Sequence, residues 1–291
     1  MSAVPHQPRQ PRQVALFTHD EPRNTTDAIS AAASAADAAG YELVLARGDL
    51  LEAPAAVPGL RIADAPPERP DLCLSLGGDG TILRALRHYT GTGVPVFGIN
   101  YGTVGFLASV EATELEAGLA RAFAGEFETV SLPGLQLEVE GRTAVAVNDV
   151  SFTRSAHERV AELSYSVSGQ EVGRVRCDGL VAATPVGSTG YNLANNGPVL
   201  AWGVEGFVVS FIAPHTLTAR ALVVAPHDVL HVINEGDRNV VEIGVDGTSA
   251  GRLGPGEEIS VGFRDGLSVL AQLEGETFYR RMREKFGKLA H

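Results

Sequence analysis

The amino-acid sequence predicts an α/β N-terminal domain with a parallel, Rossmann-like sheet, then a β-rich, sandwich-type C-terminal domain and a C-terminal helix. Before residue 130, short apolar runs alternate with helical patterns, which is typical of βαβ units. After residue 130, apolar residues recur at every second position, as half-buried antiparallel strands require. We therefore divide the chain into a tail (1–13), an α/β domain (14–130), a β-rich domain (131–275) and a helix that packs back on the first domain (276–291).

In the first domain we expect strands and helices in alternation. Apolar runs predict strands at residues 14–18, 43–46, 72–76 and 94–99. A helix is expected to begin at Asn24-Thr25-Thr26, because these residue types cap helix N-termini, and to end at Gly40. A second helix is expected at residues 81–89, directly after a glycine-rich turn.

In the second domain we expect mainly antiparallel strands. Apolar and more polar residues alternate clearly at residues 163–167, 241–245 and 259–263. The one clear interruption is at residues 189–195, and a polar helix is expected from 277 to 288. The N-terminal residues are rich in Pro, Gln and Arg and have no apolar core, so we interpret them as a loose tail rather than a signal peptide.

The composition excludes several classes of partner. The net charge is −12, and the only basic run is at residues 280–283, which argues against a nucleic-acid or anionic membrane surface. The longest apolar runs are far shorter than the ~20 residues needed to cross a bilayer, so we expect a soluble protein. Cys73 and Cys177 stand in no metal or redox spacing, and the histidines are scattered, so we expect a reducing cytoplasm and no protein-held metal.

The segment Gly77-Gly78-Asp79-Gly80-Thr81 follows an apolar strand and opens a helix. Glycines let backbone N–H groups approach an anion, and a helix N-terminus adds partial positive charge, so the segment favours phosphate binding. A carboxylate beside phosphates suggests Mg²⁺ binding or proton acceptance, and therefore chemistry. The alternative is a Gly-Asp turn that only caps the helix.

A second apolar strand, which begins at Asp178-Gly179, also ends in a turn rich in Gly, Ser and Thr. The turn and the short helix that follows it read Gly187-Ser188-Thr189-Gly190-Tyr191-Asn192. Its hydroxyls and amides suit a phosphate or ribose, and Tyr191 suits stacking on a base; the alternative is a capped helix with Tyr191 in the core. The G-x-S-x-G spacing of a nucleophile elbow is not present.

Asn148-Asp149 interrupts a strand-like run, so these residues either end the strand at a loop or face a ligand.

Together these motifs resemble NAD kinases. The resemblance covers about residues 70–275 and rests on motifs that occur in the family's order: Gly77-Gly78-Asp79-Gly80-Thr81, Gly98-Ile99-Asn100, Gly105-Phe106-Leu107, Asn148-Asp149, Asp178-Gly179, the Thr184-to-Tyr191 block, Pro214-His215-Thr216-Leu217 and Asp246-Gly247. The family more often has Asn-Glu at Asn148-Asp149 and a Thr at Val186. Diacylglycerol-type lipid kinases share the first motif, so a lipid kinase and a non-catalytic dinucleotide-binding protein are the alternatives.

The resemblance implies phosphorylation of the 2′-hydroxyl of the adenosine ribose of NAD, with ATP or polyphosphate as donor and Mg²⁺ or another divalent cation as cofactor. It implies that Asp79 is the catalytic base and that Asp178 faces the nicotinamide end of the ligand, of its own or a neighbouring subunit. The other residues that it places at the substrates are Gly77, Gly78, Gly80, Thr81, Phe106 (near the adenine), Asn148, Asp149, Arg159, Arg176, Ser188, Thr189, Gly190, Tyr191, Asn192, Leu193, Ala194 and Thr248.

A homodimer or homotetramer is expected for two reasons. NAD kinases, which the chain resembles, are commonly dimers or tetramers. In addition, predicted strands of the β-rich domain have apolar side chains on both faces, and a second copy of the chain would cover one of these faces. These apolar residues include Val208, Phe211, Val223 and Val224. The dinucleotide is expected to bridge the two glycine-containing turns.

Overall fold

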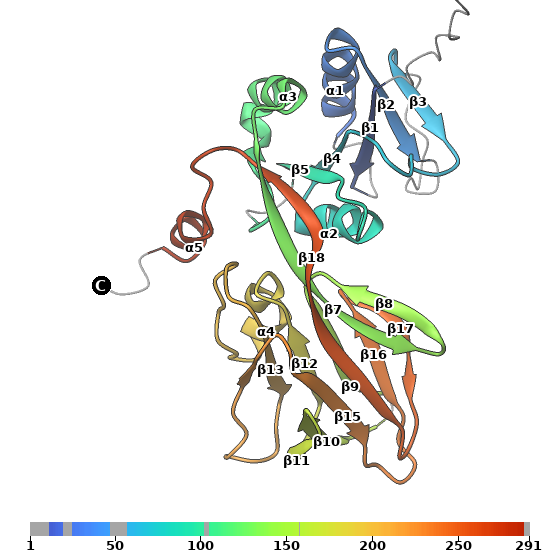
Figure 1. Cartoon of the computed structure of the whole chain (residues 1–291), viewed down its shortest axis with the longest axis vertical. Helices are drawn as coiled ribbons and strands as arrows, with labels where there is room; N and C mark the ends of the chain where they lie inside the picture. Colours follow the sequence, from blue (N-terminus) through green and yellow to red (C-terminus); the bar gives the residue numbers. More distant parts are fainter. Residues whose placement is uncertain (1–11, 20–24, 47–56, 102–104, 157, 288–291) are drawn as a thin grey trace, which may run out of the picture. The chain divides into compact units, whose positions relative to one another are not determined.

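The computed structural model describes residues 12–19, 25–46, 57–101, 105–156 and 158–287. The chain forms two compact units (Figure 1). The first contains the described residues up to Ala85, Val94–Val130 and those from Leu270 onward; the second contains Leu86–Gly93 and Ser131–Val269.

The first unit is built on a parallel sheet, as predicted. Its strands are β1 (Arg12–Thr18), β2 (Tyr41–Ala46), β3 (Leu60–Ala63), β4 (Leu72–Gly77), β5 (Pro95–Asn100) and β6 (Val110–Glu111). The order is β5-β4-β1-β2-β3, β6 pairs with β5, and these pairs are parallel. β1 begins at Arg12, inside the predicted tail, because Gln13 bonds Asp71 and Glu42. The rest of that tail, 1–11, lies outside the described residues.

Helices pack on both faces of this sheet. The helices are α1 (Thr26–Ala38), α2 (Asp79–His88) and α3 (Leu115–Ala124), the last preceded by a 3-10 turn, Ala112–Glu114. α1 and α3 share one apolar cluster with Leu74 and Phe97. α2 packs on the opposite face, where Gly98 leaves room for Ile82. α3 and β3 were not predicted, although Gly125, with φ 74°, ends α3 as a left-handed cap.

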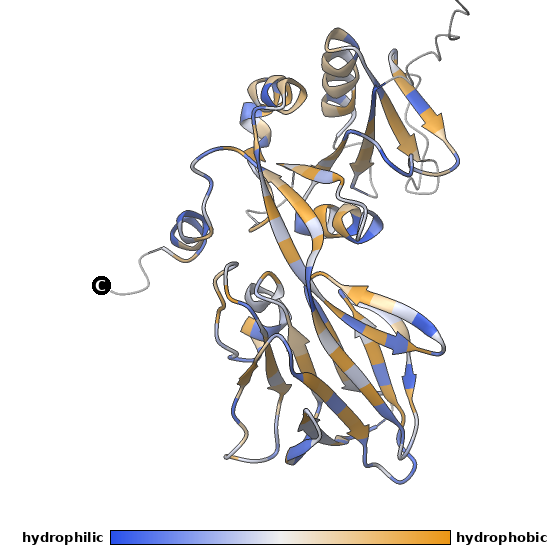
Figure 2. Cartoon of the chain, viewed as in Figure 1, coloured by the Kyte–Doolittle hydropathy of each residue, from blue (hydrophilic) through white to orange (hydrophobic). Residues whose placement is uncertain are grey.

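The second unit is an antiparallel sandwich, which confirms the predicted fold class. One sheet contains β7 (Glu128–Val139), β8 (Arg142–Ala146), β10 (Ala161–Val167), β11 (Gln170–Cys177), β15 (Val229–Asn234) and β18 (Glu258–Gln272). The other has the order β14 (Leu222–Val224), β13 (Phe207–Ile212), β12 (Gly179–Ala183), β9 (Asp149–Arg154), β16 (Val241–Val245), β17 (Thr248–Leu253). Their inner faces share one core, to which Phe152, Phe207 and Val232 contribute. Figure 2 shows the apolar residues concentrated along these strands.

The outer face of β12 and β13 is covered by the chain itself. Val208 packs there with Val181 and Leu200, after the short helix α4 (Tyr191–Ala194). Phe211 and Val224 belong to the sandwich core, and of the four apolar residues expected to meet a second copy only Val223 is exposed, at 49%. That argument for an oligomer is therefore wrong, because the segment after α4 provides the cover.

The C-terminal helix α5 (Phe278–Phe286) belongs to the first unit. Thr277 caps it, since its side chain accepts the N–H of Arg280 at 3.2 Å. Gly287, with φ 68°, follows its last turn, so the helix ends earlier than predicted. In the described part of the chain, no helix is long and apolar enough to cross a membrane.

Candidate active site

Asp79 is held at the start of α2 by backbone amides of a distant loop. Its Oδ2 accepts the N–H of Phe106 at 2.8 Å, and its Oδ1 accepts the N–H of Leu107 at 3.1 Å. A Cβ at Gly105 would lie 2.0 Å from Asp79 Oδ1, so only glycine fits there. The two N–H donors stabilise the negative charge of the carboxylate and fix its orientation.

The turn around Asp79 presents free N–H groups. Thr81 and Ile82 donate theirs to the Gly78 carbonyl, at 3.0 and 3.2 Å. Among the described residues, the N–H groups of Gly78, Asp79 and Gly80 have no acceptor, as expected at a helix start. Gly77 is required sterically, because a Cβ there would lie 2.3 Å from Thr81 Oγ1. The arrangement can bind an anion beside a carboxylate.

Phe106 is covered by α5. Its ring centroid lies 6.5 Å from that of Phe278 and 5.7 Å from that of Phe286, and Lys285 Nζ lies 4.5 Å from the Phe106 centroid. The expected contact of Phe106 with adenine stays a prediction, and in this structure the ring packs against α5 instead.

In the second unit, Asp246 organises the turn that carries Asn148 and Asp149. Its carboxylate accepts the N–H groups of Val147, Asn148 and Asp149 at 3.0, 2.7 and 3.0 Å. Arg87 Nε lies 3.7 Å from Asp246 Oδ2. The apolar run at residues 144–152 is therefore not one continuous strand. It is interrupted between β8 and β9, where the backbone N–H groups bond to the Asp246 carboxylate.

Asp149 is a buried carboxylate next to another. Its side chain is 7% exposed, and burial, followed by the negative charge of Asp246, raises the pKa of Asp149 to about 7. Burial also raises the pKa of Asp246, against the effect of its three N–H donors and of Arg87. Asp149 therefore gains or loses its proton near neutral pH.

Asn148 is held by its backbone and keeps a side-chain acceptor without a partner. Thr184 donates its N–H to the Asn148 carbonyl at 2.9 Å, and a Cβ at Gly187 would lie 2.1 Å from that oxygen. Asn148 Oδ1 is buried and has no hydrogen-bond partner among the described residues. An unpaired buried acceptor is costly, so a group that donates a hydrogen bond to Asn148 Oδ1 would be bound favourably.

The side chains of two predicted site residues form hydrogen bonds within the loop between β12 and β13. The Ser188 hydroxyl donates to the Pro185 carbonyl at 2.7 Å and accepts the N–H of Leu200 at 2.9 Å. Asn192 donates its side-chain amide to the carbonyls of Ser188 and Pro198, at 2.9 and 3.0 Å. Both side chains are fully buried, so they fix the shape of the turn.

Tyr191 lies at the surface close to the acidic residues. Its side chain is 40% exposed, and its pKa is raised by burial and then by the charges of Asp149 and Asp178. Asp178 is ion-paired with Arg154 at 2.9 Å. The charges of Asp149 and Asp178 thus act on Tyr191, and Thr189 Oγ1 donates to the Val186 carbonyl at 3.2 Å. Gly190 and Ala194 are exposed beside Tyr191, and Leu193 is half-buried.

Three further predicted site residues are Arg176, Arg159 and Thr248. Arg176, on β11, is paired with Glu162 at 3.1 Å. Arg159 is exposed in the loop between β9 and β10. No contact within the described residues joins either arginine to Asp149. Thr248 is exposed and accepts a bond from Arg87 Nη1 at 3.3 Å.

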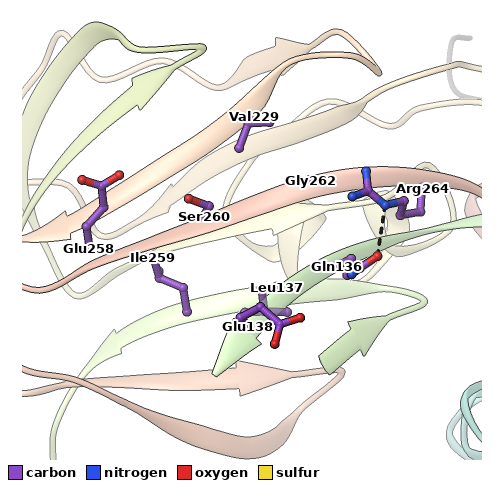
Figure 3. Close-up of a pocket in the computed structure, with 9 residues that line it drawn as sticks. All are labelled: Gln136, Leu137, Glu138, Val229, Glu258, Ile259, Ser260, Gly262 and Arg264. Carbon is purple, nitrogen blue, oxygen red and sulfur yellow. Dashed lines mark hydrogen bonds between the residues drawn. The ribbon is translucent and has the colours of Figure 1, made fainter. Parts of the chain in front are cut away.

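Two hollows lie among the described residues of the second unit. One, of about 420 Å³, lies on β7, β15 and β18, where Arg264 donates to Gln136 at 3.0 Å (Figure 3). No predicted site residue lines it. The other, of about 390 Å³, is lined by Ala194, Ser210 and Arg220, among others. In the part of the chain that the structure describes, no group of three His, Cys, Asp or Glu side chains could hold a metal ion.

Three residues near these groups were not predicted as site residues. Asp246 belongs to the Asp246-Gly247 motif that the sequence shares with NAD kinases, and its φ of 47° is typical of a tight turn. The sequence did not predict its bonds to residues 147–149. Arg87 and Arg281 carried no sequence signal, since each bonds to a residue far away in the chain.

A Rossmann-like unit with a carboxylate beside free amides, and a sandwich with paired acidic residues, are the features of a nucleotide-dependent phosphotransferase. Residues 62–127 match the family model "ATP-NAD kinase N-terminal domain", and residues 147–264 match "ATP-NAD kinase C-terminal domain". The chain belongs to the ATP-NAD kinase family and is an enzyme of that family.

Relatives and solved structures agree with this assignment. The NAD kinase of Ralstonia nicotianae is 33% identical over 284 residues, covering 94% of this chain and 92% of the relative. That of Carboxydothermus hydrogenoformans is 32% identical, covering 84% and 89%. Yeast NADH kinase complexed with NADH shares the fold, with a TM-score of 0.82 at 21% identity, covering 97% and 89%. An Archaeoglobus fulgidus NAD kinase in complex with ATP has a TM-score of 0.72 at 27% identity, covering 95% and 98%. The resemblance in the sequence is confirmed, and the lipid-kinase and binding-only alternatives have no support.

Proposed function

We propose that the chain transfers a phosphoryl group from ATP to the 2′-hydroxyl of the adenosine ribose of NAD, which yields NADP. The observation that carries this proposal is the Asp79 carboxylate, fixed by two N–H donors next to the free N–H groups of Gly78 and Gly80. Family membership supports the two substrates.

In this mechanism Asp79 takes the proton of the ribose hydroxyl. A hydroxyl is a poor nucleophile, and a positioned base contributes about 10²- to 10⁴-fold to the rate. The N–H groups at the start of α2 bind phosphate oxygens and offset their negative charge. Because Asp79 is held by backbone amides, little reorientation is needed when the substrate binds.

The second unit recognises the dinucleotide. Asn148 Oδ1 lacks a partner and accepts a ligand hydroxyl or amide, and Asp149, when ionised, accepts a ribose hydroxyl. Tyr191 offers its exposed ring to a base. The buried side chains of Ser188 and Asn192 keep the turn in shape through hydrogen bonds within the loop.

A divalent cation enters with the donor. Mg²⁺ is usually bound by one or two carboxylates together with substrate phosphates, and the described residues contain no dedicated cluster. The phosphates of ATP would hold the cation, and the cation would offset negative charge on the transferred group.

A coupled assay tests the proposal directly. Purified full chain is incubated with Mg²⁺, NAD and ATP, and NADP is detected with an NADP-specific dehydrogenase. Parallel arms replace ATP by polyphosphate or NAD by NADH, and they identify the preferred pair. Formation of NADP supports the proposal, whereas absence of NADP with phosphorylation of diacylglycerol vesicles contradicts it.

We also propose a homodimer or homotetramer in a reducing cytoplasm. Leu217 is 93% exposed and Val223 is exposed on the edge strand β14, which favours a contact between copies in this region. Cys73 and Cys177 are both buried, and they stand in no metal or redox spacing, as a reducing compartment allows. Light scattering that gave a mass near 30.5 kDa for a fully active sample would contradict the assembly.

A further inference from the structure

Arg281 is a buried cation in the first unit. It lies on α5 and is 4% exposed, although arginines are almost never fully buried unless paired. Burial lowers its pKa, while the charges of Glu276 and then Asp79 act in the opposite direction. Its Nε lies 3.8 Å from Glu276 Oε2. Burying a charge costs free energy unless the charge is paired and hydrogen-bonded, so the partners of the guanidinium indicate why it is buried.

The guanidinium donates to the loop that holds Asp79. Arg281 Nη1 donates a hydrogen bond to the Phe106 carbonyl. That carbonyl belongs to the same peptide group as the Leu107 N–H, which donates to Asp79 Oδ1 at 3.1 Å. The peptide group is therefore bonded on one side to a cation and on the other to the carboxylate. A charged donor on the carbonyl polarises the peptide and strengthens the N–H bond.

The end of β18 and the segment that leads into α5 keep the guanidinium in place. With the Gln272 amide in the orientation that its neighbours favour, its oxygen accepts Arg281 Nη2 at 3.1 Å and its nitrogen donates to the Glu276 carbonyl at 3.1 Å. The rings of Phe278 and Phe286 pack on Phe106. Arg281 is thus fixed at both ends of its planar head, which matches a positioning role better than a surface ion pair does.

We infer that Arg281 is a positioning residue for phosphoryl transfer: through the Phe106–Leu107 peptide group it fixes the carboxylate that takes the ribose proton. This inference rests on the proposed role of Asp79 as the base. Arg281 touches neither substrate in this account. Its loss therefore lowers kcat and leaves substrate binding nearly unchanged.

The test compares three variants of the full chain. Arg281→Met removes the donor and keeps the chain length, and Arg281→Lys keeps a charged donor. Arg280→Met is the matched control, because Arg280 lies beside Arg281 on α5 and pairs with Glu276 and Glu284, whereas within the described residues it is not bonded to Phe106. Circular dichroism verifies folding, and Arg281→Gln replaces Arg281→Met if the latter is unfolded.

The expected result is a split between kcat and KM. Arg281→Met lowers kcat by about tenfold or more, while KM for NAD and for ATP changes by less than about threefold. Arg281→Lys retains kcat within about fivefold of the parent, and Arg280→Met within about twofold. A kcat of Arg281→Met equal to that of Arg280→Met, or a loss that appears only in KM, overturns the inference.

Hydrogen exchange gives a readout that does not depend on activity. The amides of residues 105–109 exchange faster in Arg281→Met than in the parent and are unchanged in Arg280→Met. Unchanged exchange in Arg281→Met refutes the link between Arg281 and the Asp79 loop. If the parent chain forms no NADP, the proposed function fails, and the catalytic part of this inference fails with it, whatever the exchange result.

Discussion

Asp246 and Asp149 are buried side by side: the Asp246 carboxylate accepts the N–H of Asp149 at 3.0 Å, and burial followed by the Asp246 charge raises the pKa of Asp149 to about 7. The turn between β8 and β9 is therefore tied to the turn after β16 by Asp246, and the negative charge of Asp246 also disfavours ionisation of Asp149. A carboxylate with such a pKa titrates within the range in which the enzyme is expected to work.

The stability of the protein should depend on this carboxylate. Because the pKa of Asp149 is raised in the folded state, the folded state binds more protons than the unfolded chain between about pH 4 and pH 7. Asp149 therefore costs stability progressively as the pH rises from 4 to 7. Asp149→Asn should gain stability relative to the parent over this range, by on the order of a few kcal/mol at pH 8.

Urea unfolding of the parent and of Asp149→Asn at pH 5 and pH 8 measures this difference. Asp178→Asn is the matched control, since Asp178 is half-exposed and paired with Arg154. A stability difference between parent and Asp149→Asn that does not grow between the two pH values would show that Asp149 is not buried as described.

Gly187 should be sensitive to a single methyl group. A Cβ there would lie 2.1 Å from the Asn148 carbonyl oxygen, and the backbone of Asn148 is held by bonds to Thr184 and Asp246. We expect Gly187→Ala to destabilise the fold by about 1–3 kcal/mol and to raise KM for NAD, because the clash displaces Asn148. Gly190→Ala is the control, since its nearest atom is at 3.3 Å; equal thermal unfolding of the two variants would contradict the account.

Tyr191 should contribute to NAD binding through its ring. Tyr191→Ala removes a stacking face worth about 1 kcal/mol, so KM for NAD should rise about fivefold and KM for ATP should change less. Tyr191→Phe keeps the ring and should stay close to the parent. If KM for NAD is unchanged in Tyr191→Ala, Tyr191 has no part in recognition.

Much of the fold could be predicted because its signals are local. The alternation at Val241, Ile243 and Val245 matches strand β16, in which these three residues are buried. β3 was missed because Leu60–Ala63 is short and only partly buried. α3 was missed although Gly125 ends it, since no N-cap side chain marks its start.

The site was harder to predict, because sequence shows residue types and not their partners. Ser188 was expected at a ligand, but its hydroxyl is bonded to Pro185 and Leu200. Arg281 gave no signal, because its bond to Phe106 spans 175 residues. The glycine turn at Asp79 could be recognised, since a buried strand, glycines and a helix start are adjacent in the chain.

The central claim is that Asp79 is the base, and kcat of Asp79→Asn tests it most directly. Asn has nearly the same shape but cannot accept the hydroxyl proton, so we predict a loss in kcat on the order of 10²-fold or more. Calorimetry should find that the variant still binds NAD, and circular dichroism that it is folded. A folded Asp79→Asn variant that keeps more than about a tenth of the parent kcat would contradict the account.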